Sequence, residues 1–303
     1  MDIYVIVVSY NFERWIEQCL GSLRRSSVPV HIVVVDNCSK DKTTEIIEQN
    51  YPEVALIKNK TNEGFGKANN MGINYALKNS CDYVFLLNQD AWIDSNVVEL
   101  LLNAFEKDPQ YGILSPVHLT GNGENLDLGF SNYTGLKSKK DLAVYETENP
   151  IVKSTIINAA FWMIPVKILH LIGGFSPLFF HSGEDIDYIN RLHYHGFEVG
   201  FCPKAFAYHD REYRKRGKED FIFQVTEYTN INYRFYRAFG YGILAGLKKA
   251  FEALRKEGLN EFYRIFAITL RLLSKSGHVI QVRKRTKNAN KYTFLNLEQT
   301  AQF

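Results

Sequence analysis

Short, nearly continuous apolar runs alternate with amphipathic segments through the first 117 residues, and this alternation limits the fold more than any other feature. The amphipathic segments have helical spacing. Runs of Val, Ile and Leu without polar alternation indicate strands buried on both faces, as in a parallel sheet covered by helices. The predicted strands are 3–9, 31–36, 54–58, 83–88 and 112–117, and the predicted helices are 12–25, 42–49, 67–78 and 97–107. We therefore predict an α/β fold with a mostly parallel central sheet flanked by helices.

The regular alternation stops after residue 117. Residues 118–150 contain several glycine, asparagine and lysine residues, which predict a loop or an irregular hairpin over the sheet. We expect a second structured block from 151 to about 210 and a basic, mainly helical region beyond it. The predicted division is one domain at 1–215, with halves at 1–117 and 151–215, followed by a C-terminal region at 216–303.

Composition excludes several classes of protein. A chain of 303 residues with 46% hydrophobic content can bury a core, and a net charge of +3 does not indicate a nucleic-acid partner. Four scattered cysteines predict neither a disulfide framework nor a zinc site, which favours a reducing cytoplasm. No charged leader precedes the first apolar run, and no run approaches the roughly 18 to 20 apolar residues that span a bilayer. We expect a protein that is soluble or at most peripheral to a membrane.

Polar residues follow three of the predicted strands, where ligands bind in an open parallel sheet. They are Ser9–Asn11, Asp36–Ser39 and Asn88–Asp90. Each could merely cap a helix, but together they favour one shared crevice. The Asp36 carboxylate could accept hydrogen bonds from a base imide or a ribose. The Asp90 carboxylate could hold a hard divalent cation that bridges diphosphate oxygens.

A glycine-containing segment, Asn62–Asn70, follows the third predicted strand and opens a helix. Backbone amides at its glycines, the helix N-terminus and Lys67 could attract an anion. The spacing is neither the dinucleotide-binding fingerprint nor a P-loop, and an ordinary glycine turn at a helix start is an equal alternative.

Three carboxylates lie at the start of another expected helix, at Glu184, Asp185 and Asp187. They could simply suit the helix dipole. If the helix starts near Glu184, Asp185 can face the crevice and act as a general base beside an acceptor hydroxyl. Asp187 and Arg191, four residues apart, could pair along the helix surface.

His209 follows a short apolar and aromatic run near the end of the second structured block. Its imidazole could complete a metal site with Asp90 or contact a phosphate. A lone histidine is more often structural, so this reading needs support from the other motifs.

Taken together, these motifs resemble the family 2 inverting glycosyltransferases of the GT-A fold, in particular the bacterial rhamnosyltransferase-like members. The resemblance covers roughly residues 3–210. It rests on Val8–Asn11, Val35–Asp41, Asn62–Gly72, Leu86–Asp90 and Glu184–Asp187 with Arg191.

The resemblance implies a role for each motif. The half at 1–117 would bind the donor, through Ser9, Tyr10, Asn11, Asp36, Gly66, Lys67, Asn70 and Asn88. Asp90 would be the metal ligand of the DxD-type motif, and His209 would close the metal–diphosphate site around a magnesium or manganese ion. The half at 151–215 would bind the acceptor, with Asp185 as the base and Glu184 beside it.

Two departures from the family pattern stand out. Asn88 occupies the first position of the DxD-type motif, which leaves a metal one fewer formal charge, and Gln89 stands where members commonly have proline. The segment Asn158–Met163 lacks the usual Gly-Ala pair, so Ala160 or Phe161 could narrow the acceptor pocket. Trp162 could stack on a sugar ring or could be an ordinary core tryptophan.

The implied activity is transfer of rhamnose or another hexose, with inversion, in cell-surface polysaccharide synthesis. The donor would be dTDP- or UDP-linked, and the acceptor would be a glycan or a lipid-linked glycan. One alternative is a non-catalytic accessory protein that binds a nucleotide sugar or a glycan. A sugar nucleotidyltransferase is a weaker alternative, because Val8–Phe12 is not a glycine-rich basic loop.

The C-terminal region carries most of the positive charge. Residues 234–291 contain fourteen Lys or Arg and three acidic residues, a net charge of +11. This region could lie on the anionic inner face of the cell membrane. The alternatives are packing on its own domain or on a sister subunit in a homodimer.

Overall fold

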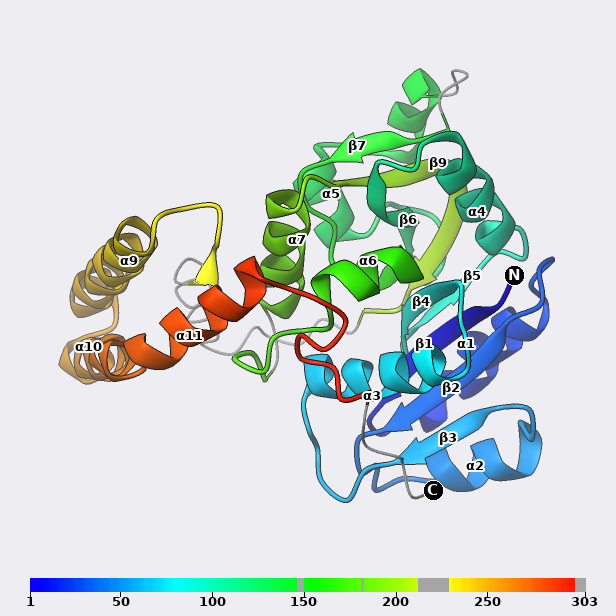
Figure 1. Ribbon diagram of the computed structural model, residues 1–303, viewed down its shortest axis with the longest axis horizontal. Coiled ribbons are helices and arrows are strands. Elements are labelled where there is room, and N and C mark those ends of the chain that lie inside the picture. Colours follow the sequence, from blue (N-terminus) through cyan, green and yellow to red (C-terminus); the bar gives the residue numbers. More distant parts are fainter. Residues whose placement is uncertain (146–149, 181–182, 212–228, 298–303) are drawn as a thin grey trace.

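A computed structural model describes residues 1–145, 150–180, 183–211 and 229–297 (Figure 1). The strands are β1 Ile3–Ser9, β2 His31–Asp36, β3 Ala55–Lys58, β4 Tyr83–Asn88, β5 Ala91–Ile93, β6 Tyr111–Thr120, β7 Val152–Ser154, β8 Phe161–Pro165 and β9 Glu198–His209. The helices are α1 Ile16–Arg24, α2 Thr43–Asn50, α3 Phe65–Lys78, α4 Val97–Lys107, α5 Leu128–Thr134, α6 Val166–Ile172, α7 Glu184–Tyr194, α9 Phe235–Lys256, α10 Leu259–Ser274 and α11 Ser276–Lys287. Two short 3-10 helices are η1 Glu13–Trp15 and η2 Lys139–Tyr145.

The strands form a nine-stranded sheet in the order β3-β2-β1-β4-β8-β6-β9-β5, with β7 paired to β9. β3, β2, β1 and β4 are parallel, as predicted for the first half. Beyond β4 the sheet is less parallel than predicted. β6 and β9 are parallel, but β8 pairs antiparallel with both β4 and β6, and β5 and β7 pair antiparallel with β9. The whole sheet is therefore mixed.

Two hydrophobic cores lie on opposite faces of the sheet. On β1, Ile3, Val5 and Val7 pack into the core beneath α1, α2 and α4, whereas Tyr4 and Ile6 pack with α3, α6 and α7. Successive side chains of a strand point to opposite faces, so a strand without polar alternation needs a covering layer on each side. The continuous apolar runs of the first half therefore predict its strands correctly.

Residues 118–150 begin with the expected irregular hairpin, in which Leu119 pairs antiparallel with Leu126, but the rest of the range contains helices that were not predicted. β6 continues to Thr120, and the helix α5 follows. The Asp127 side chain caps α5 by accepting a hydrogen bond from the Phe130 backbone N–H at 3.1 Å. With only seven residues, α5 is too short to show a clear helical repeat of apolar residues. The glycine and asparagine content of the segment therefore predicts a loop instead.

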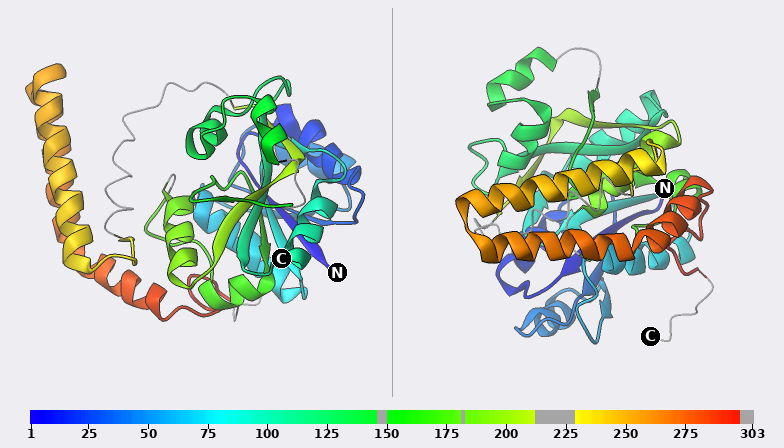
Figure 2. Two further views of the ribbon diagram at one scale, coloured as in Figure 1. Left: turned by 90° about the horizontal axis from the view of Figure 1, so that it is seen from above. Right: turned by 90° about the vertical axis from the view of Figure 1, so that its left-hand side faces the viewer.

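The C-terminal region is helical, as predicted. α9 and α10 run side by side as a hairpin that stands apart from the sheet, and α11 leads from the hairpin back to the domain (Figures 1 and 2). Beyond α11, the chain packs on the domain again: Gly174 donates its N–H to the Thr293 carbonyl at 2.9 Å, and Leu295 is buried in the core beside α3 and α6. The segment after α11 is therefore part of the domain, although it lies beyond residue 216. Within the described ranges, no helix is both long and apolar enough to cross a membrane.

Candidate active site

A buried carboxylate, Asp36, lies at the carboxyl end of β2 beside the end of β1. Asp36 is 3% exposed and accepts hydrogen bonds from the Ser9 hydroxyl at 3.0 Å, the Ser39 backbone N–H at 3.0 Å and the Ser39 hydroxyl. Ser9 and Asp36 are register partners in the parallel pair, which explains their contact. The hydroxyls therefore fix the carboxylate at the edge of the crevice.

Gln89 joins the ends of β1 and β4. Its side-chain oxygen accepts the Tyr10 N–H at 2.7 Å, and its side-chain amide donates to the Tyr10 carbonyl at 3.2 Å. Asn11 follows with a left-handed φ of 54° and accepts the Lys40 N–H at 2.9 Å. The backbone that carries Tyr10, which is 45% exposed, is thus held from both neighbouring loops.

His209, at the end of β9, lies between two carboxylates. Its Nε2 is 3.3 Å from an Asp90 oxygen, and its Nδ1 is 3.9 Å from an Asp127 oxygen. β5 and β9 are paired with Ala91 opposite His209, so the sheet itself brings Asp90 to the imidazole. The predicted contact between Asp90 and His209 is present, although sequence reasoning did not select Asp127.

Arg211 supplies positive charge next to this cluster. Its Nε is 3.4 Å from Asp127. Burial alone would raise the pKa of Asp90, but the hydrogen bond and charge of His209, with the charge of Arg211, hold that pKa below its ordinary value. Asp90 is therefore an anion at neutral pH, which is the state that a metal ligand needs.

The start of α7 carries two carboxyl groups with raised pKa values. Burial and the nearby charges of Asp185 and Asp187 raise the pKa of Glu184 to about 8. Burial also raises the pKa of Asp185, while backbone N–H groups of Ile186 and Ala159 and the charge of Arg211 act in the opposite direction. Two neighbouring carboxyl groups therefore differ in their environments, as acid–base residues of enzymes do.

The N-terminus of α3 connects the Asp36 side of the crevice to α7. Asn37 donates its side-chain amide to the Gly64 carbonyl at 3.3 Å, and a Cβ on Gly66 would lie 3.8 Å from the Glu184 Cβ. Gly64 has φ +80°, and a side chain there would overlap the Phe180 carbonyl. The glycines thus let the crevice loops approach each other closely.

Two other residues of this segment have structural partners. Lys67 forms an ion pair with Glu63 on the helix surface. Asn70 is buried and donates its side-chain amide to the Phe175 carbonyl at 2.9 Å and to the Phe294 carbonyl at 3.2 Å. The amide of Asn70 thus fixes two loops, and its predicted contact with a donor stays a prediction.

Trp162 is fully buried, which contradicts the predicted stacking on a sugar ring. Its indole stacks on Phe175 at 6.0 Å between ring centroids and donates its N–H to the Ile157 carbonyl at 3.2 Å. Both the ring face and the polar atom have protein partners, so no face is open to a ligand. The core alternative is correct.

The pair formed by Asp187 and Arg191 exists but is buried, so the predicted surface location is wrong. The two side chains are 2% and 1% exposed, and the Arg191 Nε is 3.0 Å from Asp187. Arg191 also donates to the Ile172 and Gly174 carbonyls at 3.2 and 2.8 Å. This ion pair anchors α7 to the loop that follows α6.

We expect Asp187→Asn to lower the free energy of unfolding by about 3 kcal/mol, because it leaves the Arg191 charge buried without its counterion. Urea denaturation would measure the change. The matched control is Glu63→Gln, which removes an exposed i,i+4 pair and should cost no more than about 1 kcal/mol. Equal effects of the two variants would contradict the buried, uncompensated charge as the cause.

Several buried polar atoms around the crevice have no hydrogen-bond partner in the described part of the protein. They are His118 Nδ1, Asn158 Oδ1, Glu184 Oε2 and His209 Nδ1. Buried polar atoms are rarely left unpaired unless the site has a further role. Their concentration near Asp90 and Asp185 supports a ligand site at this place in the fold.

The residues at this place suit a divalent cation that takes only some of its ligands from the protein. Asp90 and His209 would offer one oxygen and one nitrogen ligand, and no group of three metal-ligating side chains occurs among the described residues. Magnesium keeps several water or phosphate ligands when it binds nucleotides, so two protein ligands suffice. Asn88, at the end of β4, adds no charge to this set.

Comparisons with known proteins agree with this geometry. The model of the family described as "Glycosyl transferase family 2" matches residues 4–174. A dTDP-rhamnosyl transferase, RfbF, from Shigella flexneri is 26% identical over 67% of each chain. An N-acetylglucosaminyl-diphospho-decaprenol L-rhamnosyltransferase from Mycobacterium tuberculosis is 24% identical over 68% of this chain and 75% of its own.

Solved structures show the same fold. The S. aureus TarS 1–349 complex with UDP-GlcNAc superposes with a TM-score of 0.61 at 16% identity, over 97% of this chain and 90% of that chain. GalNAc-T7 with UDP, GalNAc and Mn2+ gives a TM-score of 0.60 at 15% identity, over 81% of this chain and 51% of that one. Both neighbours have the GT-A fold, which confirms the predicted architecture.

Proposed function

The chain belongs to glycosyl transferase family 2, and we propose that it transfers a hexose, rhamnose by preference, from a dTDP- or UDP-linked donor with inversion of the anomeric centre. The proposal is supported most by the contacts that link the three motifs. Gln89, next to Asp90, bonds to Tyr10. Asn37, next to Asp36, bonds to Gly64, and Gly66 lies against Glu184 at the start of α7. The rhamnosyltransferase relatives support the choice of sugar. The donor-binding half is proposed as 1–117 and the acceptor half as 151–215.

The donor nucleoside is assigned to the ends of β1 and β2. The Asp36 carboxylate would accept from the base or the ribose, while the exposed Tyr10 ring would cover the nucleoside. Ser9 acts through Asp36, because its hydroxyl is already donated there. Asn11, Asn88, Gly66, Lys67 and Asn70 complete the proposed donor set.

A magnesium or manganese ion, held by Asp90 and His209, would neutralise the charge that develops on the leaving diphosphate. The Asp127 carboxylate lies 3.9 Å from the other nitrogen of the His209 ring, and a hydrogen bond formed between them on metal binding would fix the orientation of the ring. Arg211, next to Asp127, would add positive charge on the same side.

Asp185 is the proposed base. It would take the proton from the acceptor hydroxyl as that oxygen attacks the anomeric carbon from the face opposite to the diphosphate, in a single displacement. Glu184, neutral at pH 7 because its pKa is about 8, would donate a hydrogen bond to the acceptor. Most of the acceleration then comes from positioning and from stabilising charge on the leaving group.

The acceptor is proposed to be a glycan or a lipid-linked glycan in cell-surface polysaccharide synthesis. The M. tuberculosis relative, whose name gives a diphospho-decaprenol acceptor, supports the lipid-linked choice. The proposed location is the reducing cytoplasm, in keeping with four free cysteines.

A panel of nucleotide diphosphate sugars, each with and without magnesium or manganese, tests this function through thermal stabilisation. A donor at about 100 times its Kd should stabilise the native state by about 2.7 kcal/mol and raise the unfolding midpoint. The donor found in this way is then incubated with lipid-linked and free glycans, and the anomeric configuration of the product is read by NMR.

Each outcome has a defined meaning. A product with inverted configuration supports the proposal, and retention contradicts the single displacement. Stabilisation without any nucleotide release would favour the accessory binding protein instead. If no donor shifts the midpoint, the assignment of the donor site is wrong.

A further inference from the structure

One face of α9 carries apolar side chains that are exposed to solvent. Tyr241, Leu244 and Phe251 are 65%, 67% and 56% exposed. Their spacing of three and seven residues places them on the same face of the helix. We call this row the α9 stripe.

Basic residues continue the α9 stripe at regular intervals. Arg237, Lys248 and Arg255 are exposed, and each lies four residues from a member of the stripe. The row therefore alternates cations with apolar side chains along the whole helix. One acidic residue, Glu252, lies at its edge.

The opposite face of α9 is a seam of small buried residues. The seam packs α9 against α10, which gives α9 its most extensive contact. Its members are Ala238, Gly242, Gly246, Ala250 and Ala253. Tyr241 and Leu244 lie on the side of α9 away from the seam. Phe251, nearer the turn to α10, touches the Phe262 ring at 5.6 Å between centroids and still keeps 56% of its surface exposed. The hairpin also stands away from the sheet (Figure 2), in keeping with the exposure of the stripe's side chains.

α10 repeats the pattern of exposed apolar residues. Leu259, Tyr263, Leu270 and Leu273 are 60%, 62%, 48% and 40% exposed, with spacings of four, seven and three residues. Exposed apolar rows on two adjoining helices are unusual for a surface in contact only with water. They indicate a partner that takes up apolar side chains.

We propose that the α9–α10 hairpin docks on the surface of an anionic lipid bilayer. Headgroup phosphates would neutralise Arg237, Lys248 and Arg255, while Tyr241, Leu244 and Phe251 enter the boundary between headgroups and acyl chains. Tyrosine is enriched at this boundary, because its ring is apolar and its hydroxyl is polar.

A second copy of this chain fits the same surface less well. In a twofold dimer the same patch faces itself, so the three cations of the α9 stripe would share one interface with the same three cations of the other copy. Like charges oppose such a contact, and on the described face of α9 only Glu252 lies beside the stripe to offset them. An anionic membrane removes this conflict.

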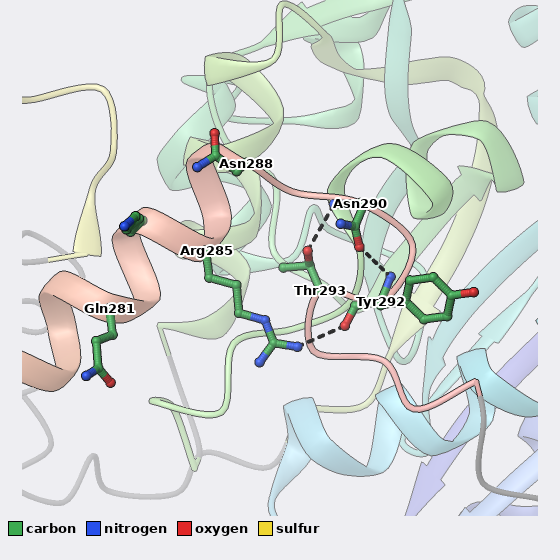
Figure 3. A pocket seen from close by; sticks show the side chains of 7 residues that line it. Gln281, Arg285, Asn288, Asn290, Tyr292 and Thr293 are labelled. Carbon is green, nitrogen blue, oxygen red and sulfur yellow. Dashed lines mark hydrogen bonds between the residues drawn. The ribbon is translucent and has the colours of Figure 1, made fainter.

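The positive charge continues on α11. Lys284 and Arg285 line a pocket of about 520 Å³ together with Gln281, Asn288, Asn290, Tyr292 and Thr293 (Figure 3). Arg285 is held in place by donating to the Tyr292 carbonyl at 2.9 Å. The base of the hairpin thus adds two cations that attract the same anionic surface.

Docking would also orient the crevice. The arrowheads of β2 and β3 point to the side of the domain where the hairpin lies (Figure 1), and Asp36 of the proposed donor site is at the carboxyl end of β2. A docked hairpin would therefore turn the crevice towards the membrane. The docking itself does not depend on the proposed transferase activity.

Co-sedimentation of the full chain with vesicles tests the proposal. The vesicles contain phosphatidylcholine alone or phosphatidylcholine mixed with phosphatidylglycerol. One variant combines Tyr241→Ser, Leu244→Ser and Phe251→Ser, and a second combines Arg237→Gln, Lys248→Gln and Arg255→Gln. The control for charge combines Lys60→Gln, Lys107→Gln and Lys204→Gln, which are exposed lysines of the sheet domain.

The wild-type chain is expected to bind the mixed vesicles and not phosphatidylcholine alone, with affinity that falls as salt is added. The charge variant should lose roughly 100-fold in partitioning, the effect of three cations at an anionic surface. The apolar variant should lose at least tenfold, and the lysine control should lose much less than the charge variant. Circular dichroism checks that all variants are folded.

Three results would overturn the proposal. These are equal binding to both kinds of vesicle, an unchanged affinity in both hairpin variants, or a lysine control that loses as much as the charge variant. Analytical ultracentrifugation tests whether a second copy of the chain is the partner instead. If the wild-type chain is a dimer, both hairpin variants are monomers and no variant binds vesicles, the surface is a dimer interface. Donor binding is measured on the same variants as a separate test of the proposed function, because the docking does not depend on it.

Discussion

Asp185→Asn is expected to lower kcat by about 1,000-fold while donor affinity stays within about twofold. The Asp185 carboxylate accepts the Ile186 N–H at 2.8 Å, and Asn has the same shape, so the start of α7 should keep its geometry. The amide cannot take a proton, and that is the property the proposed base needs. Steady-state kinetics and calorimetric titration of the donor would measure both quantities.

Glu184→Gln is the matched control for this variant. Because the pKa of Glu184 is about 8, the group is mostly protonated at pH 7, and glutamine reproduces a neutral side chain of the same size. We expect a change in kcat of only a few fold. If Asp185→Asn keeps more than a tenth of the wild-type turnover, or if Glu184→Gln is the more damaging variant, Asp185 is not the base.

The pH profile gives a second check on the same residue. Burial raises the pKa of Asp185, so the carboxylate takes up a proton at a higher pH than an exposed aspartate does. The base is active when it is deprotonated, and kcat/KM should therefore fall as the pH is lowered through this raised pKa. The small residual activity of Asp185→Asn should lack this decline.

Asp90→Asn is expected to remove the metal-dependent part of donor binding. Loss of a direct ligand should weaken the manganese-dependent affinity by at least about 100-fold, since even outer residues of metal sites contribute 10- to 100-fold. Titrating the donor with and without manganese would separate this effect from any loss of the metal-independent contacts. The folded state should be retained, because 24% of the Asp90 side chain is exposed.

Asp94→Asn is the control on the same segment. Asp94 accepts a hydrogen bond from the Tyr208 hydroxyl at 3.0 Å, just beyond the end of β5, and has no assigned role in donor binding. Its substitution should leave the manganese dependence unchanged. If Asp90→Asn binds the donor with the same manganese dependence as Asp94→Asn, Asp90 does not hold the metal.

The first half of the fold could be predicted because each strand is covered on both faces. Four predicted ranges, 3–9, 31–36, 83–88 and 97–107, match β1, β2, β4 and α4 at both ends. The second half of the fold could not be predicted in this way, because its strand pairing joins residues that are far apart in the sequence. Nothing in the segment Phe161–Pro165 indicates that it lies antiparallel between β4 and β6.

The candidate site shows the same division. Asp36, Asp90 and the start of α7 follow apolar runs or open a helix, so local patterns indicate them. Asp127 lies in an irregular stretch, and its place beside His209 depends on the pairing of β6 with β9, which the sequence does not show. The type of a residue does not by itself reveal its role. A tryptophan such as Trp162 can fill a hydrophobic core or stack on a sugar ring, and only the structure distinguishes the two.

The contact of Asn70 with Phe294 has a consequence for synthesis of the protein. The two residues are 224 positions apart, so at roughly 5 to 20 residues per second the ribosome needs about 10 to 45 s to supply the second partner. Until then the Asn70 amide lacks this acceptor, and the core position of Leu295 is empty. The nascent domain is thus completed only after the hairpin has been made.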